Sequence, residues 1–416
     1  MCVAKPFTIS KNLVLEAYKR VRANKGSAGI DAESLEEFEN KLKPNLYKVW
    51  NRMSSGSYFP PPVKAVSIPK KQGGERILGV PTVSDRVAQM VVKMVLEPEI
   101  EPHFLDDSYG YRPRKSALNA ISITRERCWE YLWLIEFDIR GLFDNIPHNL
   151  LMKAVRKHTQ NKWIILYIER WLKAPISNNK GELIARDKGT PQGGVISPLL
   201  SNLFLHYVFD VWLTKNHSNI PWSRYADDGV LHCRTNKQAK YIMNQLKRRF
   251  EECGLEMHSD KSKIVCCANT KQSWTGDVRS FDYLGYTFRV RRSMNSITGK
   301  VNGNFLPGVS CDSLNAMRRK IRKLKIHRWT NCSIEEIAIK INPIIQGWIN
   351  YYAKFTRTAF YPICRQINMK LVKWARNKYK SLKKHKVKTI EFLERICANN
   401  KGLFAHWKSG MVRSFV

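Results

Sequence analysis

Apolar residues recur every three or four positions over several long stretches of the chain, which is the spacing of one helix face. In the first 300 residues this pattern predicts helices around Leu13–Val21, Leu35–Trp50, Val83–Leu96 and Lys237–Cys253, and one after Ser197-Pro198. Ser197 is expected to be the N-cap of the last of these, because Ser is a preferred cap and Pro a preferred first helical residue. From about Ser313 onward the pattern is wholly helical, over Leu314–Trp329, Ile334–Lys354 and Ala359–Lys380.

Shorter runs predict strands between these helices. Val63–Pro69 alternates apolar and polar residues, and the nearly all-apolar run before Asp138 is typical of a strand buried on both faces. Phe281–Val290 predicts a further strand. Two strand-like runs, Trp222–Ala226 and Val230–Cys233, flank Asp227-Asp228-Gly229, and Asp-Gly between strands is a hairpin signal. The expected fold is therefore α+β for three quarters of the chain, followed by an all-helical module.

The charge of the chain changes this picture, because it points to a polyanionic partner. The 416 residues hold 71 Lys+Arg against 35 Asp+Glu, a net charge of +36. Residues 301–416 contain 24 of these basic residues and only 5 acidic ones. No apolar run approaches the roughly 20 residues that a membrane span requires, so we expect nucleic acid and not a membrane as the partner. The helical module is then the segment that grips it.

The ten cysteines do not form a metal-binding pattern. They are scattered, and the only close pair is Cys266-Cys267. Neither a zinc ribbon nor a secreted disulfide framework is supported by this spacing, so we expect reduced, mostly buried thiols and no zinc.

Three aspartates are the strongest candidates for chemistry. Asp138 ends a predicted strand, and Asp227 and Asp228 stand side by side in a predicted turn. Adjacent carboxylates ionise at a cost unless a cation lies between them, and carboxylates suit Mg²⁺. Two such ions would activate a primer 3′-hydroxyl and stabilise the departing pyrophosphate. Taken alone, however, Asp-Asp-Gly could equally be a hairpin turn, and Asp138 could cap a helix.

Ordered motifs around these aspartates resemble those of reverse transcriptases. They are Phe137-Asp138, Thr190–Gly194 followed by Ser197-Pro198, and Tyr225–Asp228. Further blocks resemble the bacterial group II intron-encoded branch: Gly26–Asp31, Ile68–Lys70, Gly74–Thr82, Ser108–Pro113, Tyr283–Tyr286 and Gly347–Tyr352. The resemblance covers nearly the whole chain, and so many blocks in order are not expected by chance.

The resemblance implies a right-hand polymerase with fingers and palm, built from an antiparallel sheet plus helices, followed by an all-helical thumb. The expected domains are an N-terminal extension with the start of the fingers (1–60), the fingers and palm (61–300), the thumb or maturase domain X (305–382) and a short basic tail (383–416) that could be a remnant DNA-binding region. It implies catalysis by Asp138, Asp227 and Asp228, with two Mg²⁺ ions, replaceable by Mn²⁺, bound by these residues and by Ile139 next to Asp138.

The resemblance also assigns contacts to the incoming deoxynucleotide. Lys70 and Arg76 would clamp the triphosphate, although exposed cations in a glycine-rich turn are usually only solvated. Phe143 would reject a 2′-hydroxyl, although an ordinary core Phe is the commoner use. Gln192 would contact the nascent base pair, and Lys261 would offset the charge of the aspartates. Arg112 is expected either to contact the template or to hold the fingers together.

Two further assignments concern nucleic acid. Tyr283, Leu284, Gly285 and Tyr286 match a primer-gripping hairpin. The basic residues of the helical module would bind RNA, although solvated helix faces are the usual fate of such runs: Arg318, Arg319, Lys320, Arg322, Lys323, Lys370, Lys373 and Arg376.

The implied function is a group II intron reverse transcriptase in the bacterial cytoplasm that also aids splicing of the intron. Its partners would be intron RNA, a primed RNA template, target DNA and dNTPs, with an oligomeric state that the sequence does not give. The paired cysteines of the family's zinc-associated endonuclease do not occur, so no such activity is expected. Two alternatives remain: a free-standing relative in phage defence or DNA repair, and a splicing cofactor that binds RNA without polymerising.

Overall fold

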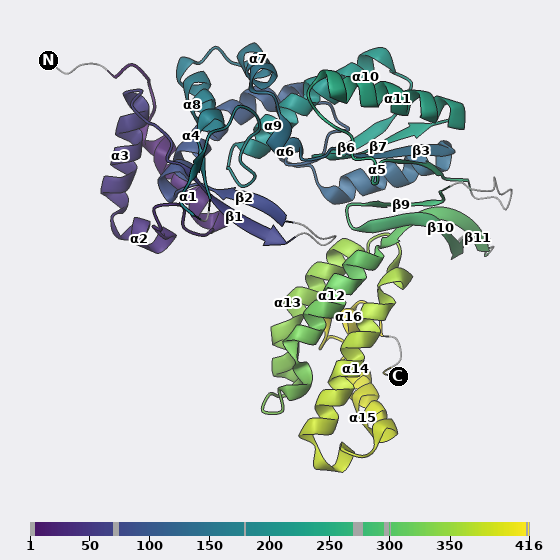
Figure 1. Cartoon of the computed structure of the whole chain (residues 1–416). Helices are drawn as coiled ribbons and strands as arrows, with labels where there is room; N and C mark the ends of the chain where they lie inside the picture. Colours follow the sequence, from purple (N-terminus) through teal and green to yellow (C-terminus); the bar gives the residue numbers. More distant parts are fainter. Residues whose placement is uncertain are drawn as a thin grey trace. The chain divides into compact units, whose positions relative to one another are not determined.

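The computed structural model describes residues 5–69, 75–178, 180–268, 278–294, 299, 301–412 and 415. The chain divides into two compact units. Unit 1 comprises residues 1–120 and 135–263, and unit 2 comprises residues 121–134 and 264–416. Both units combine helices and sheet, and the C-terminal half of unit 2 is helical, so the expected α+β fold with a helical C-terminal module is confirmed (Figure 1).

One part of unit 1, built from residues before 104 and between 148 and 184, combines helices with a small sheet. The helices are α1 (Lys11–Asn24), α2 (Leu35–Asn40), α3 (Leu42–Ser54), α4 (Val83–Ile100), α7 (His148–His158) and α8 (Lys162–Lys173), with the short η1 (Glu101–His103). The sheet has the order β2-β1-β4-β5, with β1 (Val63–Pro69), β2 (Glu75–Val80), β4 (Ile176–Ser177) and β5 (Leu183–Ile184). Strands β1 and β2 are antiparallel, whereas β1 and β4 are parallel.

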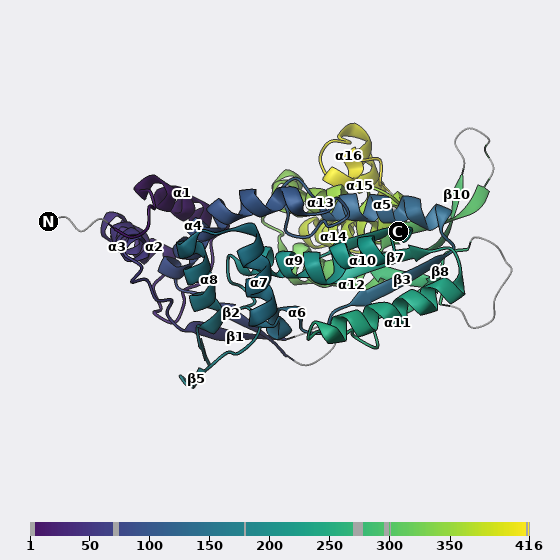
Figure 2. The same cartoon turned by 90° about the horizontal axis from the view of Figure 1, so that it is seen from above.

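A second sheet has the order β6-β7-β3-β8, with β6, β7 and most of β3 in unit 1 and most of β8 in unit 2. Its strands are β3 (Trp133–Asp138), β6 (Trp222–Tyr225), β7 (Asp228–Cys233) and β8 (Lys263–Cys266), and the surrounding helices are α6 (Leu142–Asn145), α9 (Ser197–Leu205), the π-helix η2 (His206–Asp210), α10 (Val211–Asn216) and α11 (Asn236–Glu252). Helices α10 and α11 cover one face of these strands, and α11 runs along the sheet (Figures 1 and 2). The ring of Phe137 lies in this core, with its centroid 5.0 Å from that of Phe209 and 5.6 Å from that of Phe250.

Unit 2 joins a three-stranded antiparallel sheet to a helical bundle. The sheet has the order β11-β10-β9, with β9 (Ser280–Tyr283), β10 (Tyr286–Met294) and β11 (Val301–Val309). Unit 2 also includes most of α5 (Ala117–Glu130). The bundle contains α12 (Cys311–Leu324), η3 (Ile326–Arg328), α13 (Ile334–Tyr352), η4 (Arg357–Phe360), α14 (Tyr361–Lys378), η5 (Lys380–Leu382), α15 (Lys386–Asn399) and α16 (Ala405–Lys408). Leu393, Phe404 and Trp407 share one hydrophobic core with Ile337 and Trp374, so the segment after residue 383 packs with the helices before it.

Four local predictions are wrong. The helix expected over Leu35–Trp50 breaks at Lys41, since Pro44 cannot donate to the carbonyl of Asn40 and its ring would clash with it. Ser197 is the first residue of α9 and not its N-cap; its hydroxyl bonds to Thr190 Oγ1 at 2.8 Å. The strand expected over Phe281–Val290 is interrupted by a turn at Leu284-Gly285.

The fourth correction concerns the hairpin between β6 and β7. Tyr225 pairs with Asp228, so the turn consists of Ala226 and Asp227, and Gly229 lies inside β7. Gly229 is needed there for space, because a Cβ at this position would lie 2.3 Å from the ring of Phe137.

Among the residues described, no helix is long and apolar enough to cross a membrane. The nine cysteines in this part of the chain are free thiols, seven of them buried.

Candidate functional site

Asp138 lies at the end of β3, where a lysine balances its charge. The Lys261 Nζ is 2.7 Å from Asp138 Oδ2, and the Asp138 carbonyl accepts the backbone N–H of His258 at 2.8 Å. Burial lowers the pKa of Lys261. Its hydrogen bond to Asp138 and the charges of the three aspartates raise this pKa by more than burial lowers it, so the net shift is upward. Ile139 is buried and forms an isolated bridge with Met257.

Asp227 is the second residue of the turn that joins β6 to β7, and Asp228 is the first residue of β7. Ala226, the first residue of this turn, has φ 58°, a left-handed conformation that a non-glycine residue rarely adopts. The turn packs tightly, since a Cβ on Gly110 would come within 2.4 Å of the Ala226 nitrogen.

The three aspartates influence one another strongly. Burial, and then the negative charges of Asp227 and Asp138, raise the pKa of Asp228 to about 8, and Asp228 shares a hydrogen bond with Asp138. Burial and the charge of Asp138 also raise the pKa of Asp227, which the charges of Arg76 and Lys261 partly oppose. Raised pKa values in clustered carboxylates indicate that the site lacks enough positive charge to keep all of them ionised.

The donor set of this cluster suits a hard cation. Carboxylate oxygens are the ligands that Mg²⁺ prefers, and the raised pKa values show the electrostatic need for one. Among the described residues, however, no three Asp, Glu, His or Cys side chains already stand as a ligand set. Asp138 instead bonds to Lys261 and to Asp228, so the residues fit a metal that would take the place of these contacts.

A loop between β5 and α9 carries Gln192 next to the β2 strand. The Gln192 carbonyl accepts the N–H of Gly79 at 2.8 Å, and its side chain accepts a hydrogen bond from Arg76 Nε. Gly193 has φ 118°, and a Cβ there would lie 2.6 Å from the Gly79 carbonyl, so only glycine allows this close approach. Phe143 is buried in α6, and its carbonyl accepts the Thr190 N–H at 2.7 Å, so it lies at the base of the same loop.

The structure therefore brings Arg76 and Lys261 into the electrostatic surroundings of the aspartates, and Gln192 bonds to Arg76. Lys70 lies outside the described residues. Sequence reasoning missed Asp144, which accepts from Gln192 Nε2 at 3.4 Å, and Tyr111, whose pKa is raised by burial and by the charge of Asp227. Tyr111 lies inside the Ser108–Pro113 block, so the block was the available signal for it.

Arg112, in the same block, holds its own loop together. Its side chain is only 6% exposed and donates to Glu101 and to the carbonyls of Leu105 and Ser108. These bonds occupy the guanidinium, which favours the loop-holding role over contact with a template.

The Tyr283–Tyr286 hairpin belongs to unit 2. Leu284 and Gly285 both have positive φ, as a two-residue type I′ turn requires. The Gly285 carbonyl accepts from the Ser310 N–H and from the Ser313 hydroxyl, and the Leu284 carbonyl accepts from the Tyr351 hydroxyl. Tyr283 and Tyr286 are buried, and the Tyr286 ring contacts the rings of Tyr351 and Tyr352 in α13.

Half of the predicted RNA-binding residues surround one pocket between α12 and α14. The pocket measures about 880 Å³, and its lining includes Arg318, Arg322, Lys370 and Lys373 together with Arg365, which the sequence analysis did not single out. The positive charges of Lys370, Arg328 and Lys373 add to burial in lowering the pKa of His327 nearby. Arg319 and Lys323 are exposed outside this pocket, Lys320 lies over the Trp348 ring, and Arg376 donates to the Lys383 carbonyl.

Comparison with known proteins gives the class to which this site belongs. Residues 68–288 match the family described as reverse transcriptase (RNA-dependent DNA polymerase). Since that match covers more than half of the chain, the chain belongs to the reverse transcriptase family. Residues 314–392 match the group II intron maturase-specific domain, which includes the basic helices α12 and α14.

Individual relatives of the chain include proteins encoded by group II introns. The chain is 32% identical to the protein YkfC of Escherichia coli K12 over 288 residues, which span 60% of this chain and 75% of YkfC. It is 34% identical to the group II intron-encoded protein LtrA of Lactococcus lactis over 383 residues, 76% of this chain and 61% of LtrA. A putative intron 1 protein of COX1/OXI3 from Saccharomyces cerevisiae is 24% identical over 83% of this chain and 49% of its own length. The chain thus spans only part of LtrA and of the yeast protein.

Among solved structures, telomerase from Candida albicans in complex with a fragment of telomeric RNA matches with a TM-score of 0.48 and 12% identity. This match covers 91% of the chain and 68% of the telomerase chain.

Proposed function

We infer that this protein is an RNA-directed DNA polymerase that extends a primer on an RNA template with dNTPs, and that it also assists the splicing of a group II intron. The observation that carries the polymerase proposal is the clustering of Asp138, Asp227 and Asp228 in a buried place, where burial and the two neighbouring charges raise the pKa of Asp228 to about 8. A pure RNA binder would gain nothing from negative charge at this place, because RNA is itself an anion.

Asp138, Asp227 and Asp228 would hold two Mg²⁺ ions, for which Mn²⁺ could substitute, with the Ile139 backbone beside them. Such ions, when bound, polarise the primer hydroxyl and neutralise charge on the reacting phosphates. The chain's own part is to fix the carboxylates. Lys261, now 2.7 Å from Asp138, would give up this contact to the metal and would remain nearby as a cation.

The nucleotide would bind between the aspartates and the Gln192 loop. Arg76 now bonds to Gln192, and a triphosphate would compete for its guanidinium, since charge-assisted bonds to phosphate are stronger than bonds to an amide. Lys70 is assigned to the same clamp through the family resemblance alone. Phe143 would face the sugar, because it lies at the base of the loop that carries Gln192.

The test is primer extension on an RNA template with Mg²⁺, comparing the wild type with Asp227→Asn. We expect cDNA from the wild type and at least a 100-fold loss in the variant. The matched control is Asp260→Asn, which removes an exposed carboxylate next to Lys261 and should extend like the wild type. Equal extension by wild type and Asp227→Asn would overturn the assignment, and no extension by the wild type would overturn the polymerase proposal.

The maturase part of the proposal rests on unit 2. The pocket between α12 and α14 would bind phosphates of the intron RNA through Arg318, Arg322, Lys370 and Lys373, and Arg365 supports it by lining the same pocket. The exposed Arg319, Lys320 and Lys323 would extend this surface, whereas Arg376 is engaged with the Lys383 carbonyl. The primer would be gripped by the Tyr283–Tyr286 hairpin, and target DNA would be the substrate for mobility in a bacterial cytoplasm.

Splicing is tested by the Mg²⁺ concentration that the flanking intron needs, with and without protein. We expect the protein to lower this concentration. If the intron splices equally without it, the maturase part is wrong, and the free-standing relative in phage defence or DNA repair becomes the better account. If the wild type supports splicing but does not extend a primer, the alternative function, a splicing cofactor that binds RNA without polymerising, would be favoured instead.

A further inference from the structure

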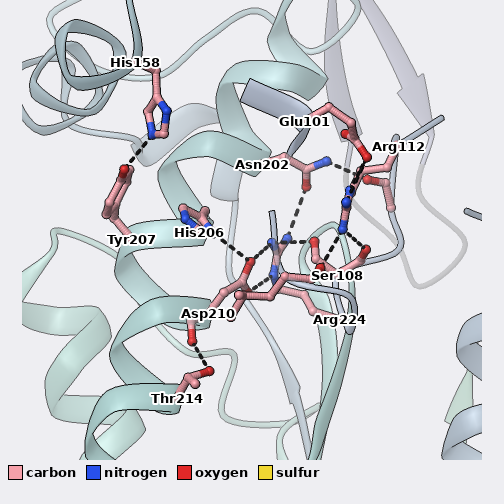
Figure 3. A network of polar contacts seen from close by, with 12 residues as sticks. Glu101, Ser108, Arg112, His158, Asn202, His206, Tyr207, Asp210, Thr214 and Arg224 are labelled. Carbon is pink, nitrogen blue, oxygen red and sulfur yellow. Dashed lines mark hydrogen bonds and ion pairs between the residues drawn. The ribbon is translucent and has the colours of Figure 1, made fainter. Parts of the chain in front are cut away.

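A fully buried arginine stands directly before the aspartate turn. Arg224 is the third residue of β6, three positions before Asp227, and its side chain has no exposure to solvent. Its backbone is also fixed, because its N–H donates to the Asp107 carbonyl at 2.9 Å and its carbonyl accepts from the Tyr109 N–H at 2.8 Å. Figure 3 shows its guanidinium at the centre of a polar network.

All five N–H groups of this guanidinium are used. Nε donates to Asp210 Oδ1 at 2.8 Å, and Nη2 donates to Asp210 Oδ2 at 2.6 Å and to Ser108 Oγ at 2.9 Å. Nη1 donates to Asn202 Oδ1 at 3.2 Å and to the Ala226 carbonyl at 3.1 Å. A guanidinium has five donors in a rigid plane. This side chain therefore fixes the position of the Ala226 carbonyl relative to the four other oxygens that accept its hydrogen bonds.

The Ala226 carbonyl is the peptide oxygen immediately before Asp227. Ala226 holds the left-handed conformation that sends the chain into Asp227 and Asp228. Its other side is fixed by Gly110, whose carbonyl accepts from Asn202 Nδ2 at 2.5 Å. Asn202 therefore bonds both to Arg224 and to the segment that packs against the turn.

The helix that carries Asn202 and Asp210 is adapted to this network. In a regular α-helix, residues eight positions apart point about 80° away from each other. The π-helix η2 at His206–Asp210 inserts one extra residue into a turn. One residue corresponds to about 100° of rotation around the helix axis, so the insertion makes Asp210 point in nearly the same direction as Asn202. Single π-turns of this kind are frequent at functional sites, and here the turn lets one helix present two acceptors to one guanidinium.

A purely structural role does not account for this arrangement. A buried ion pair is often no more stable than a well-packed apolar pair of the same size, so core stability does not require Arg224 and Asp210. What an apolar pair could not do is to hold the Ala226 carbonyl.

We propose that Arg224, held by Asp210 and Asn202, is a positioning residue that sets the separation of Asp227 and Asp228 from Asp138 and thereby the affinity of the site for divalent cations. The proposal rests on the proposed metal site of the polymerase. Arg224 itself contacts neither substrate nor metal and acts through the peptide that precedes Asp227.

The test measures Mn²⁺ binding to the nucleic-acid-free protein by electron paramagnetic resonance, beside the melting temperature and the Mg²⁺ concentration for half-maximal primer extension. Arg224→Lys keeps the charge but supplies only three donors. We expect it to weaken Mn²⁺ binding by about tenfold or more, the usual effect of losing a residue that orients a metal ligand. The Mg²⁺ requirement should rise in parallel, while KM for dNTP at saturating Mg²⁺ stays unchanged.

The matched control is Arg170→Lys. Arg170 donates to the Gly56 and Tyr58 carbonyls, so the same substitution removes similar bonds in another part of unit 1. It should lower the melting temperature without changing Mn²⁺ affinity. The double variant Arg224→Met with Asp210→Leu replaces the ion pair by an apolar pair, and we expect it to keep the fold yet to bind Mn²⁺ as weakly as Arg224→Lys.

Wild-type Mn²⁺ affinity in the folded double variant, or in Arg224→Lys, would overturn the positioning role. If Arg224→Lys does not fold, the double variant decides. Asn202→Ala, which removes one of the two acceptors of Nη1 but leaves the ion pair, gives a second measurement in the same assay. If the proposed metal site itself were wrong, the result would differ from failure of the positioning role, because Asp227→Asn would then bind Mn²⁺ as well as the wild type does.

Discussion

Lys261 and a proton on Asp228 together offset most of the charge of the aspartate cluster when no cation is bound. Lys261 is 2.7 Å from Asp138, and the pKa of Asp228 is raised to about 8. A divalent cation should therefore displace a proton as it binds. Affinity for Mg²⁺ is then expected to increase as the pH rises towards 8.

The raised pKa of Asp228 also predicts how the metal-free protein responds to pH. A carboxylate whose pKa is higher in the folded than in the unfolded state binds more protons when folded, so stability is greatest at low pH and falls as the pH rises from about 4 to about 8. Asp228→Asn carries no such proton and should remove this part of the fall. Denaturant unfolding at several pH values in EDTA measures it.

Asp85 is the internal control for this experiment. Burial raises its pKa to about 6, so it contributes to the same fall only up to that pH. The difference between wild type and Asp228→Asn should therefore continue to grow between pH 6 and 8. A difference that stays constant over that interval would contradict the raised pKa of Asp228.

Phe143 carries a second prediction at this scale. If its ring excludes a 2′-hydroxyl, Phe143→Ala should lower the ratio of dNTP to rNTP incorporation by about tenfold or more, the scale on which removing bulk from a pocket changes specificity. Single-nucleotide extension with each substrate measures the ratio. Leu142→Ala makes a similar cavity at the neighbouring buried position and should leave the ratio unchanged. An unchanged ratio in Phe143→Ala would make this residue an ordinary core Phe.

Among the elements, β7 depends on the absence of a side chain at Gly229. A Cβ there would lie 2.3 Å from a ring atom of Phe137, which Phe209 and Phe250 hold in place. Gly229→Ala should therefore cost about 1–3 kcal/mol of unfolding free energy, as overpacking of cores does. Gly347→Ala is the matched control: nothing lies within 4 Å of its Cβ position, and Ala is the better helix former. Denaturant midpoints should move in opposite directions for the two variants, and equal midpoints would contradict the packing argument.

The sequence predicted most elements correctly where apolar residues repeat at helical spacing over a long stretch, as in α1, α4, α11 and α13. It failed where a single residue decides the local geometry. Pro44 splits one helix, and the turn of the aspartate hairpin lies two positions earlier than Asp228-Gly229 indicates, with Ala226 in a left-handed conformation.

The candidate site shows the same limit. The motifs identified the aspartates, Arg76 and Gln192, whereas Arg224 was not found. Its partners Asp210, Asn202 and Ser108 are far from it in sequence, and only the fold and the π-helix bring them together.

For the whole molecule, the large positive charge predicts salt-dependent binding of RNA. If Arg322 and Lys373 each contact a phosphate, replacing either by Gln should lower the slope of log affinity against log salt by about 0.7–0.9. Filter binding to the intron RNA at several salt concentrations measures the slope. Arg395→Gln removes the same charge from exposed α15 and should change the slope less. Equal slopes in all three variants would mean that net charge, and not the pocket, governs binding.

The order in which the two units are encoded has a consequence for synthesis on the ribosome. Residues 121–134 belong to unit 2 but leave the ribosome long before the rest of it: Trp129 donates to the Phe305 carbonyl, 176 positions later, and the Leu132 carbonyl accepts from the Cys267 N–H. Most of α5 therefore cannot form these contacts until the remainder of unit 1 has been translated. During that interval the nascent chain offers a binding site for chaperones, and slow codons between residues 135 and 263 would prolong its exposure.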